Sequence, residues 1–307
     1  MDLLVRFAKR IKYYPLFELL GTANMSASLL DYLKSGSLYF LPHHAVSRVV
    51  FKLTRIQSRY VPKAIELFTK AFDVNLDEAI NSDPKSYNTF NEFFTRQLKP
   101  ELRPLASSKI TSPVDGTISQ LGKIENGSLL QAKGVTYTLE SLVGGNPERA
   151  KLYEDGQFIT VYLSPKDYHR IHMPCSGKLT EQTHIPGRLF SVAKHTVNTI
   201  KGIFARNERV IATFDTEYGP MAMVLVGAIN VAAIETVWAG LITPPKGETI
   251  TSKNLRAKDI SLEKGDEMGR FNMGSTVILL FANGAPELRK DLKADQRLKM
   301  GQVLSND

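Results

Sequence analysis

The chain has 307 residues, 43% of them hydrophobic, and a formal net charge of +8, which is enough sequence for one large domain or a domain with an appendage. The charge is concentrated at one end: residues 1–70 hold 11 Lys and Arg against 4 Asp and Glu, and the remainder is nearly balanced. A nucleic-acid enzyme would spread positive charge over its working face, so we expect no nucleic-acid partner, and the single cysteine excludes an intramolecular disulfide.

The N-terminal region, residues 1–75, is expected to be helical. Short helices are predicted over 3–11 and 26–33, and a longer one from Pro62 to about Phe72, because proline is favoured in a first turn. The clearest helix runs from about Ala45 to Tyr60. Its apolar residues form one stripe, and roughly opposite lies a purely basic stripe of Arg48, Lys52, Arg55 and Arg59.

That amphipathic pattern has two readings. A surface helix packed on its own core is one, and a helix lying in a membrane interface is the other. The basic stripe favours the membrane, because anionic lipid surfaces attract Lys and Arg. No apolar stretch reaches the ~20 residues needed to span a bilayer, so we expect peripheral attachment.

The rest of the chain divides into a connector and a β-rich domain. Residues 76–108 are the predicted connector, and residues 109–307 show short β-type runs bounded by glycine and proline. Strands are expected over 117–121, 158–163, 210–214, 223–226 and 276–281. A weak echo between 113–118 and 174–179 indicates two similar β units. The predicted fold class is therefore α+β: a helical, membrane-facing N-terminal region followed by a β-rich catalytic domain.

Three residues in the order Asp115, His172, Ser275 carry the candidate chemistry. A serine hydroxyl becomes a useful nucleophile when a base takes its proton, imidazole suits that task near neutral pH, and a carboxylate can orient the imidazole. Each residue alone also has a structural explanation, as a turn aspartate, a buried histidine or the first residue of a strand.

Ser275 follows Gly274 and leads directly into an apolar run, without the Gly-x-Ser-x-Gly elbow of many hydrolases. An external substrate would reach such a serine with difficulty, whereas the Gly274 carbonyl is adjacent and unobstructed by a side chain. The sequence therefore favours an attack by the serine on its own backbone.

His169 and His172 are three residues apart, a spacing that can hold a metal ion. No third ligand stands at motif spacing, so we expect no metal.

Seven stretches, in order along the chain, carry a resemblance to a known family. They are Phe90–Arg96, Pro113–Gly116, Tyr162–Pro174, Leu189–Val192, Phe204–Arg209, Glu235–Gly240 and Gly269–Thr276. From about Leu41 to Gln302 the sequence resembles bacterial phosphatidylserine decarboxylase, a membrane-associated enzyme that depends on a pyruvoyl group. Met273 stands where the family usually has leucine, and residues 1 to about 38 lie outside the resemblance.

The resemblance implies self-cleavage between Gly274 and Ser275. Ser275 would attack the Gly274 carbonyl, with His172 as base and Asp115 orienting it. The resulting ester would eliminate, and the new terminus would lose ammonia to become a pyruvoyl group. Chains 1–274 and 275–307 would stay together as a heterodimer, and further assembly of heterodimers is left open.

The resemblance also implies the reaction and its place. The pyruvoyl group derived from Ser275 would form a Schiff base with phosphatidylserine, carbon dioxide would leave, and phosphatidylethanolamine would result. His169 is the candidate for the acid that returns a proton or polarises the imine. The basic helices would hold the enzyme on the cytoplasmic face of the cell membrane.

Three other functions compete with this one. A serine hydrolase using the same triad on an external ester or peptide predicts one intact chain. A non-enzymatic lipid-binding protein predicts that the triad residues are dispensable. A pyruvoyl enzyme for a soluble amino acid leaves the basic N-terminal region without a purpose.

Overall fold

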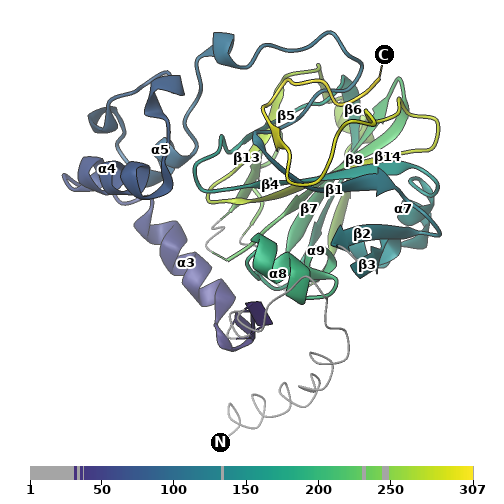
Figure 1. Ribbon diagram of the computed structural model, residues 1–307, viewed down its shortest axis with the longest axis horizontal. Coiled ribbons are helices and arrows are strands. Elements are labelled where there is room, and N and C mark those ends of the chain that lie inside the picture. The colour runs from purple at the N-terminus through teal and green to yellow at the C-terminus, as the bar shows by residue number, and fades with distance from the viewer. Residues whose placement is uncertain are drawn as a thin grey trace, which may run out of the picture.

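The computed structural model describes residues 31–32, 35–36, 38–132, 135–229, 233–243 and 249–306, and the side chains of Phe40 and Ser275 are outside this description. The helix expected over 3–11 and most of the one expected over 26–33 lie outside the described residues. The N-terminal helices gather on one side of the molecule, and a β-rich region with a few short helices forms the rest, as the α+β prediction requires (Figure 1).

The helical side contains α3 (His43–Leu53), α4 (Val61–Phe72) and α5 (Phe90–Phe94). Pro62 occupies the first turn of α4, which confirms the helix predicted there. The helix predicted from 45 to 60 is wrong in its second half, because α3 ends at Leu53. The Thr54 carbonyl accepts a hydrogen bond from the Asn91 backbone N–H at 2.8 Å, so it is directed towards α5 instead of continuing the helix.

These helices share a small hydrophobic core with the segment that follows them. Val61, Ile65, Phe93 and Phe94 are buried together. The predicted connector therefore contributes to the packing of the helical region, and the domain boundary at residue 75 stays a prediction. Short 3-10 helices complete this part: η2 (Leu38–Phe40), η3 (Leu76–Glu78), η4 (Pro84–Ser86) and η5 (Pro100–Leu102).

The β region is built on a nine-stranded antiparallel sheet whose central pair is β8 (Gly219–Val226) and β14 (Ser275–Phe281). Its order is β11-β6-β7-β8-β14-β4-β1-β15, and β12 also pairs with β6. All five strands predicted from sequence are confirmed within it. The other bounds are β1 (Gly116–Lys123), β4 (Gln157–Leu163), β6 (Gly177–Ile185), β7 (Arg209–Thr216), β11 (Thr251–Asn254), β12 (Ser261–Leu262) and β15 (Arg297–Leu298).

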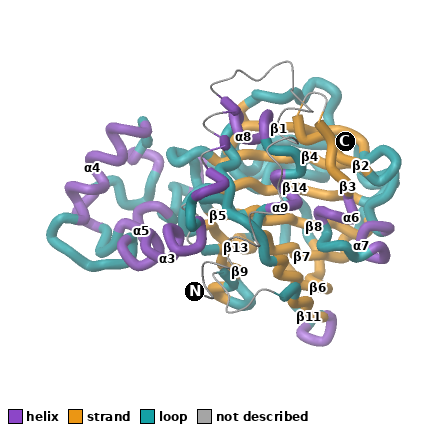
Figure 2. Tube along the Cα trace, turned by 90° about the horizontal axis from the view of Figure 1, so that it is seen from below, coloured by secondary structure: helices purple, strands orange, loops and turns teal. Residues whose placement is uncertain are grey.

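Two smaller sheets flank the large one, as Figure 2 shows. One contains β5 (Arg170–His172), β9 (Ile234–Thr236), β10 (Gly240–Leu241) and β13 (Glu267–Phe271), and the other pairs β2 (Ser128–Ala132) with β3 (Val135–Thr138). Short helices lie between strands: α6 (Leu139–Leu142), α7 (Pro147–Lys151), α8 (Lys194–Thr199), α9 (Ile203–Arg206) and η6 (Arg256–Lys258).

The expected pair of similar β units agrees with the strand order. Counting outward from β8 and β14, strands β6 and β1 occupy equivalent positions. The two turns that precede them are joined: Thr111 N–H donates to the Pro174 carbonyl and His172 N–H donates to the Pro113 carbonyl, both at 2.9 Å. This junction brings the Asp115 and His172 segments together.

Candidate active site

The Gly274–Ser275 peptide lies where the chain enters β14. This strand is hydrogen-bonded on both sides, to β4 and to β8, and its residues 276–280 are fully buried. The backbone of Ser275 is opposite Leu163. A strand held on both edges fixes residue 275 in place whether or not the preceding peptide bond is intact.

His169 lies against this peptide. A Cβ atom placed on Gly274 would stand 3.6 Å from His169 Nε2. The Nδ1–H of His169 donates to the Asp167 carbonyl at 2.7 Å, so Nε2 carries the lone pair, and Nε2 has no hydrogen-bond partner among the described residues. The ring packs on Phe94 at a centroid distance of 4.2 Å. His169 thus presents a buried acceptor nitrogen, without a partner among the described side chains, beside the bond expected to break.

Burial makes this imidazole hard to protonate. It lowers the pKa of His169 from 6.5 to about 4, and the charge of Arg96 acts in the same direction. At neutral pH the group is therefore a neutral acceptor.

The same shift predicts an acid-sensitive fold. Because the folded pKa is below the unfolded value, the unfolded chain binds the extra proton first, so stability falls as pH drops from 6.5 to about 4. The free energy of unfolding should decrease by about 3 kcal/mol over this window through His169 alone. Urea unfolding of uncut Ser275→Ala, with and without His169→Gln, measures this. Equal pH slopes in the two variants would contradict it.

His172 is engaged at both ring nitrogens. Its Nδ1–H donates to the Gly265 carbonyl at 2.8 Å, and its Nε2 accepts from the Tyr168 hydroxyl at 3.0 Å. Burial lowers the pKa of His172 below its ordinary value. His172 is thus a neutral imidazole whose acceptor nitrogen is covered by a phenol.

Asp115 is paired with an arginine, Arg103, instead of with a histidine. The Arg103 guanidinium donates to both carboxylate oxygens, with contacts of 2.9 Å from Nε and 2.5 Å from Nη2, and the Met300 N–H donates to Oδ1 at 2.8 Å. Arg103 also donates to Glu78 at 2.6 Å. These two carboxylates raise the pKa of Arg103 above its usual range. Asp115 therefore belongs to a buried ionic cluster in which Met300 comes from the segment after the expected cut.

The structure brings the predicted residues into one region without joining them as a triad. His169 contacts the Gly274 position, whereas Asp115 and His172 each have other hydrogen-bond partners. Sequence reasoning missed Arg103 and Tyr168. Tyr168 falls inside the stretch 162–174, which carries the family resemblance, and Arg103 gave no signal because its partner is 12 residues away in an irregular segment.

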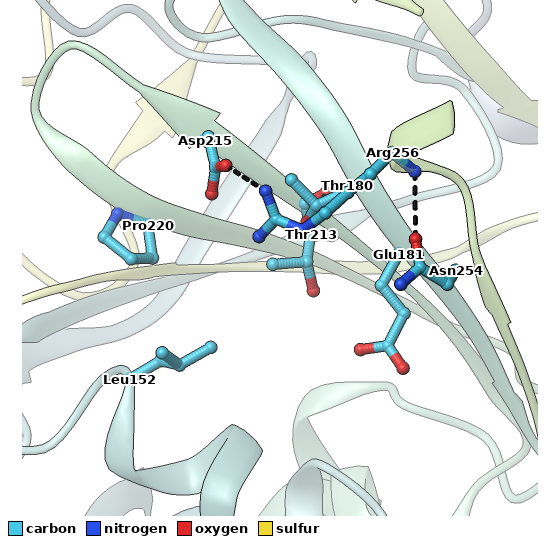
Figure 3. A pocket seen from close by; sticks show the side chains of 8 residues that line it. All are labelled: Leu152, Thr180, Glu181, Thr213, Asp215, Pro220, Asn254 and Arg256. Carbon is cyan, nitrogen blue, oxygen red and sulfur yellow. Dashed lines mark hydrogen bonds and ion pairs between the residues drawn. The ribbon is translucent and has the colours of Figure 1, made fainter. Parts of the chain in front are cut away.

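A pocket elsewhere has no such chemistry. It is lined by Leu152, Thr180, Glu181, Thr213, Asp215, Pro220, Asn254 and Arg256 (Figure 3). Its arginine is paired with Asp215, and Pro220 precedes Met221, which pairs with Phe281 at the far end of β14 from Ser275, roughly 20 Å along the strand. Within the described ranges, no group of three or more His, Cys, Asp or Glu side chains is arranged to hold a metal ion.

Comparison with known proteins identifies the family. The family profile described as phosphatidylserine decarboxylase matches residues 90–306. A phosphatidylserine decarboxylase proenzyme of Alkalilimnicola ehrlichii is 52% identical over 91% of this chain and 97% of its own length. Proteins of the same name from Nitrosococcus oceani and Vibrio cholerae are 53% and 48% identical, over 90% and 89% of this chain and 92% and 98% of their own lengths. The chain therefore belongs to the phosphatidylserine decarboxylase family of carboxy-lyases.

Proposed function

We propose that this carboxy-lyase converts phosphatidylserine to phosphatidylethanolamine and carbon dioxide, using a pyruvoyl group that it makes from Ser275. Family membership over most of the chain supports the reaction. The observation that carries the cofactor proposal is the glycine–serine peptide at the entrance of a buried strand, beside His169 Nε2, which no described residue hydrogen-bonds.

The residues around position 275 fit a pyruvoyl group. When present, the group supplies a ketone that takes up the substrate amine and accepts the electron pair released with carbon dioxide. Strand β14 anchors it through the backbone ladder to β4 and β8. Phe94 and the buried segment around His169 exclude water, and His169 is placed to hold or return a proton at Nε2.

We assign the self-cleavage to the predicted triad. The Ser275 hydroxyl attacks the Gly274 carbonyl, its proton passes to His172, and the C–N bond breaks to give an ester. Elimination then releases Gly274 as a carboxylate, and hydrolysis of the remaining dehydroalanine releases ammonia. Three contacts must change for this triad to form. Tyr168 must leave His172 Nε2, and His172 Nδ1–H must leave the Gly265 carbonyl. Asp115 must exchange part of its bonding to Arg103 for the imidazole.

His169 is a second candidate for the cleavage base, because its Nε2 already lies beside Gly274. Intact masses of His172→Ala and His169→Ala separate the two assignments. The triad predicts that His172→Ala stays whole and His169→Ala is cut. The reverse pattern would transfer the base to His169.

We also propose that α3 and α4 dock the enzyme on an anionic membrane surface. Among the described residues, no helix has the length and apolar character to cross a bilayer. The two helices and the segment between them nevertheless expose large apolar side chains beside basic ones: Val49, Leu53, Ile56, Tyr60, Leu67 and Phe72. Apolar insertion combined with Lys and Arg is the chemistry of an interfacial helix.

Two charged substitutions on this face should weaken vesicle binding. Leu53 and Leu67 are each 60% exposed, so Leu53→Asp/Leu67→Asp removes insertable surface without opening the core. We expect a loss of about tenfold or more in affinity for vesicles containing phosphatidylglycerol, measured by sedimentation. Leu130→Asp/Leu152→Asp is the matched control. These exposed leucines belong to β2 and to the end of α7, which lie on the side of the molecule away from α3 and α4 (Figure 1). Equal losses in both variants would contradict the assignment of this face.

A further inference from the structure

Arg96 is a buried cation that forms no ion pair with any described residue. The residue is 5% exposed, and its Nη2 donates to the Lys166 carbonyl at 3.1 Å. Nε and Nη1 have no acceptor among the described residues. Burial lowers the pKa of Arg96, which shows that the surroundings disfavour its charge. Buried N–H donors without an acceptor destabilise the folded state, so we expect Arg96 to have a function that offsets this cost.

Arg96 lines a cavity of about 390 Å³ whose carboxylates are already neutralised. Asp115 and Glu78 are paired with Arg103, and Asp167 is paired with Arg297 at 2.6 Å. The fourth carboxylate, that of the exposed Asp73, faces Lys166 at 3.6 Å. The nearby negative charges are therefore committed elsewhere, and Arg96 keeps its positive charge available. The cavity also receives residues 297–299 from the segment after the expected cut, so both expected chains build it.

A short segment connects Arg96 to the reacting position. The Lys166 carbonyl accepts from Arg96, and the next carbonyl, that of Asp167, accepts from His169 Nδ1–H. His169 in turn faces Gly274. Two consecutive carbonyls, those of Lys166 and Asp167, therefore link the guanidinium to the histidine that faces the reacting position. In a serine headgroup only a few bonds separate the amine from the phosphorus.

We propose that Arg96 binds the phosphodiester of the substrate headgroup, an inference that rests on the proposed function. The guanidinium donors suit a phosphate oxygen through charge-assisted hydrogen bonds. The substrate carboxylate is the poorer ligand, because a cation held on it would stabilise the charge that departing carbon dioxide must give up. The phosphodiester keeps its charge throughout the reaction, so Arg96 binds ground state and transition state alike.

Uniform binding of this kind predicts a specific kinetic signature. With short-chain phosphatidylserine as soluble substrate, Arg96→Gln should raise KM roughly 10- to 100-fold while kcat stays within about threefold. Arg96→Lys, which keeps the charge, should raise KM less. Arg256→Gln is the matched control, since Arg256 lines the distant pocket of Figure 3 and should leave both constants unchanged.

Folding and cleavage are measured on the same samples. Arg96 forms no ion pair with a described residue, so Arg96→Gln leaves no buried carboxylate without its cation. The variant should be cut like the wild type and be at least as stable to heat. A wild type that stays whole would defeat the proposed function instead. A cut Arg96→Gln with unchanged KM, or with reduced kcat alone, overturns the phosphate assignment.

Inorganic phosphate distinguishes the source of the anion. It should inhibit the wild type in competition with the lipid and lose this effect in Arg96→Gln. If phosphate binds the wild type but KM of Arg96→Gln is unchanged, the site takes the free ion and the headgroup assignment fails.

Discussion

The His169→Ala variant is expected to decarboxylate with a kcat roughly 10²- to 10⁴-fold below that of the wild type, while its chain is still cut between Gly274 and Ser275. His169 Nε2 lies beside Gly274, and no described residue forms a hydrogen bond with it. A lost proton donor or acceptor at this position should affect the chemical step. It should leave the affinity for lipid largely unchanged.

The measurement is carbon dioxide release under saturating substrate, with the chain masses determined on the same preparation. His195→Ala serves as the control, because His195 lies in α8 and is separate from the site. A kcat within about threefold of the wild type in fully cut His169→Ala would remove His169 from the reaction.

The second large effect concerns stability. Arg103→Leu should lower the free energy of unfolding by about 3–5 kcal/mol, because it leaves Asp115 buried without its cation. The side chains of Arg103 and Asp115 are 5% and 7% exposed, so water compensates little. Replacing both partners should restore most of the loss, since an apolar pair carries no uncompensated charge.

Urea unfolding of the uncut Ser275→Ala chain tests this with Arg103→Leu, Asp115→Leu and the double variant. The Ser275→Ala background keeps the protein a single chain. This matters because Met300 N–H, a further partner of Asp115, lies after the cleavage position and would otherwise belong to the second chain. A single-variant loss below about 1 kcal/mol would show that the pair contributes little. A double variant no more stable than Arg103→Leu would contradict the charge argument.

Local signals predicted the strands well because each one is bounded by turn residues. The five expected strands, including the run after Ser275, are all present. The helix predicted over 45–60 is too long, because hydrophobic periodicity does not reveal that the Thr54 carbonyl accepts a hydrogen bond from the Asn91 N–H. That contact is made between segments far apart in the sequence, and a single sequence gives no pattern for it.

In the candidate site, too, local sequence signals gave part of the answer and tertiary contacts gave the rest. The resemblance named His169 as the candidate acid, and the structure places its Nε2 beside Gly274. The partners of Asp115 and His172 depend on tertiary contacts. Their partners are Arg103, Tyr168 and the Gly265 carbonyl, which lie in irregular segments and in a turn. Pairings of this kind follow from how the two β units meet at residues 111–113 and 172–174. The sequence offered candidate residues, but it did not give the hydrogen bonds that they make.

The intact mass of the purified protein beside Ser275→Ala tests the central claim most directly. The account predicts that the wild type separates into chains 1–274 and 275–307, with the smaller chain lighter by one ammonia than a chain that begins with serine. Ser275→Ala should remain a single chain of 307 residues. A wild type that stays whole in the presence of membranes, or a small chain that still begins with serine, would contradict the pyruvoyl mechanism.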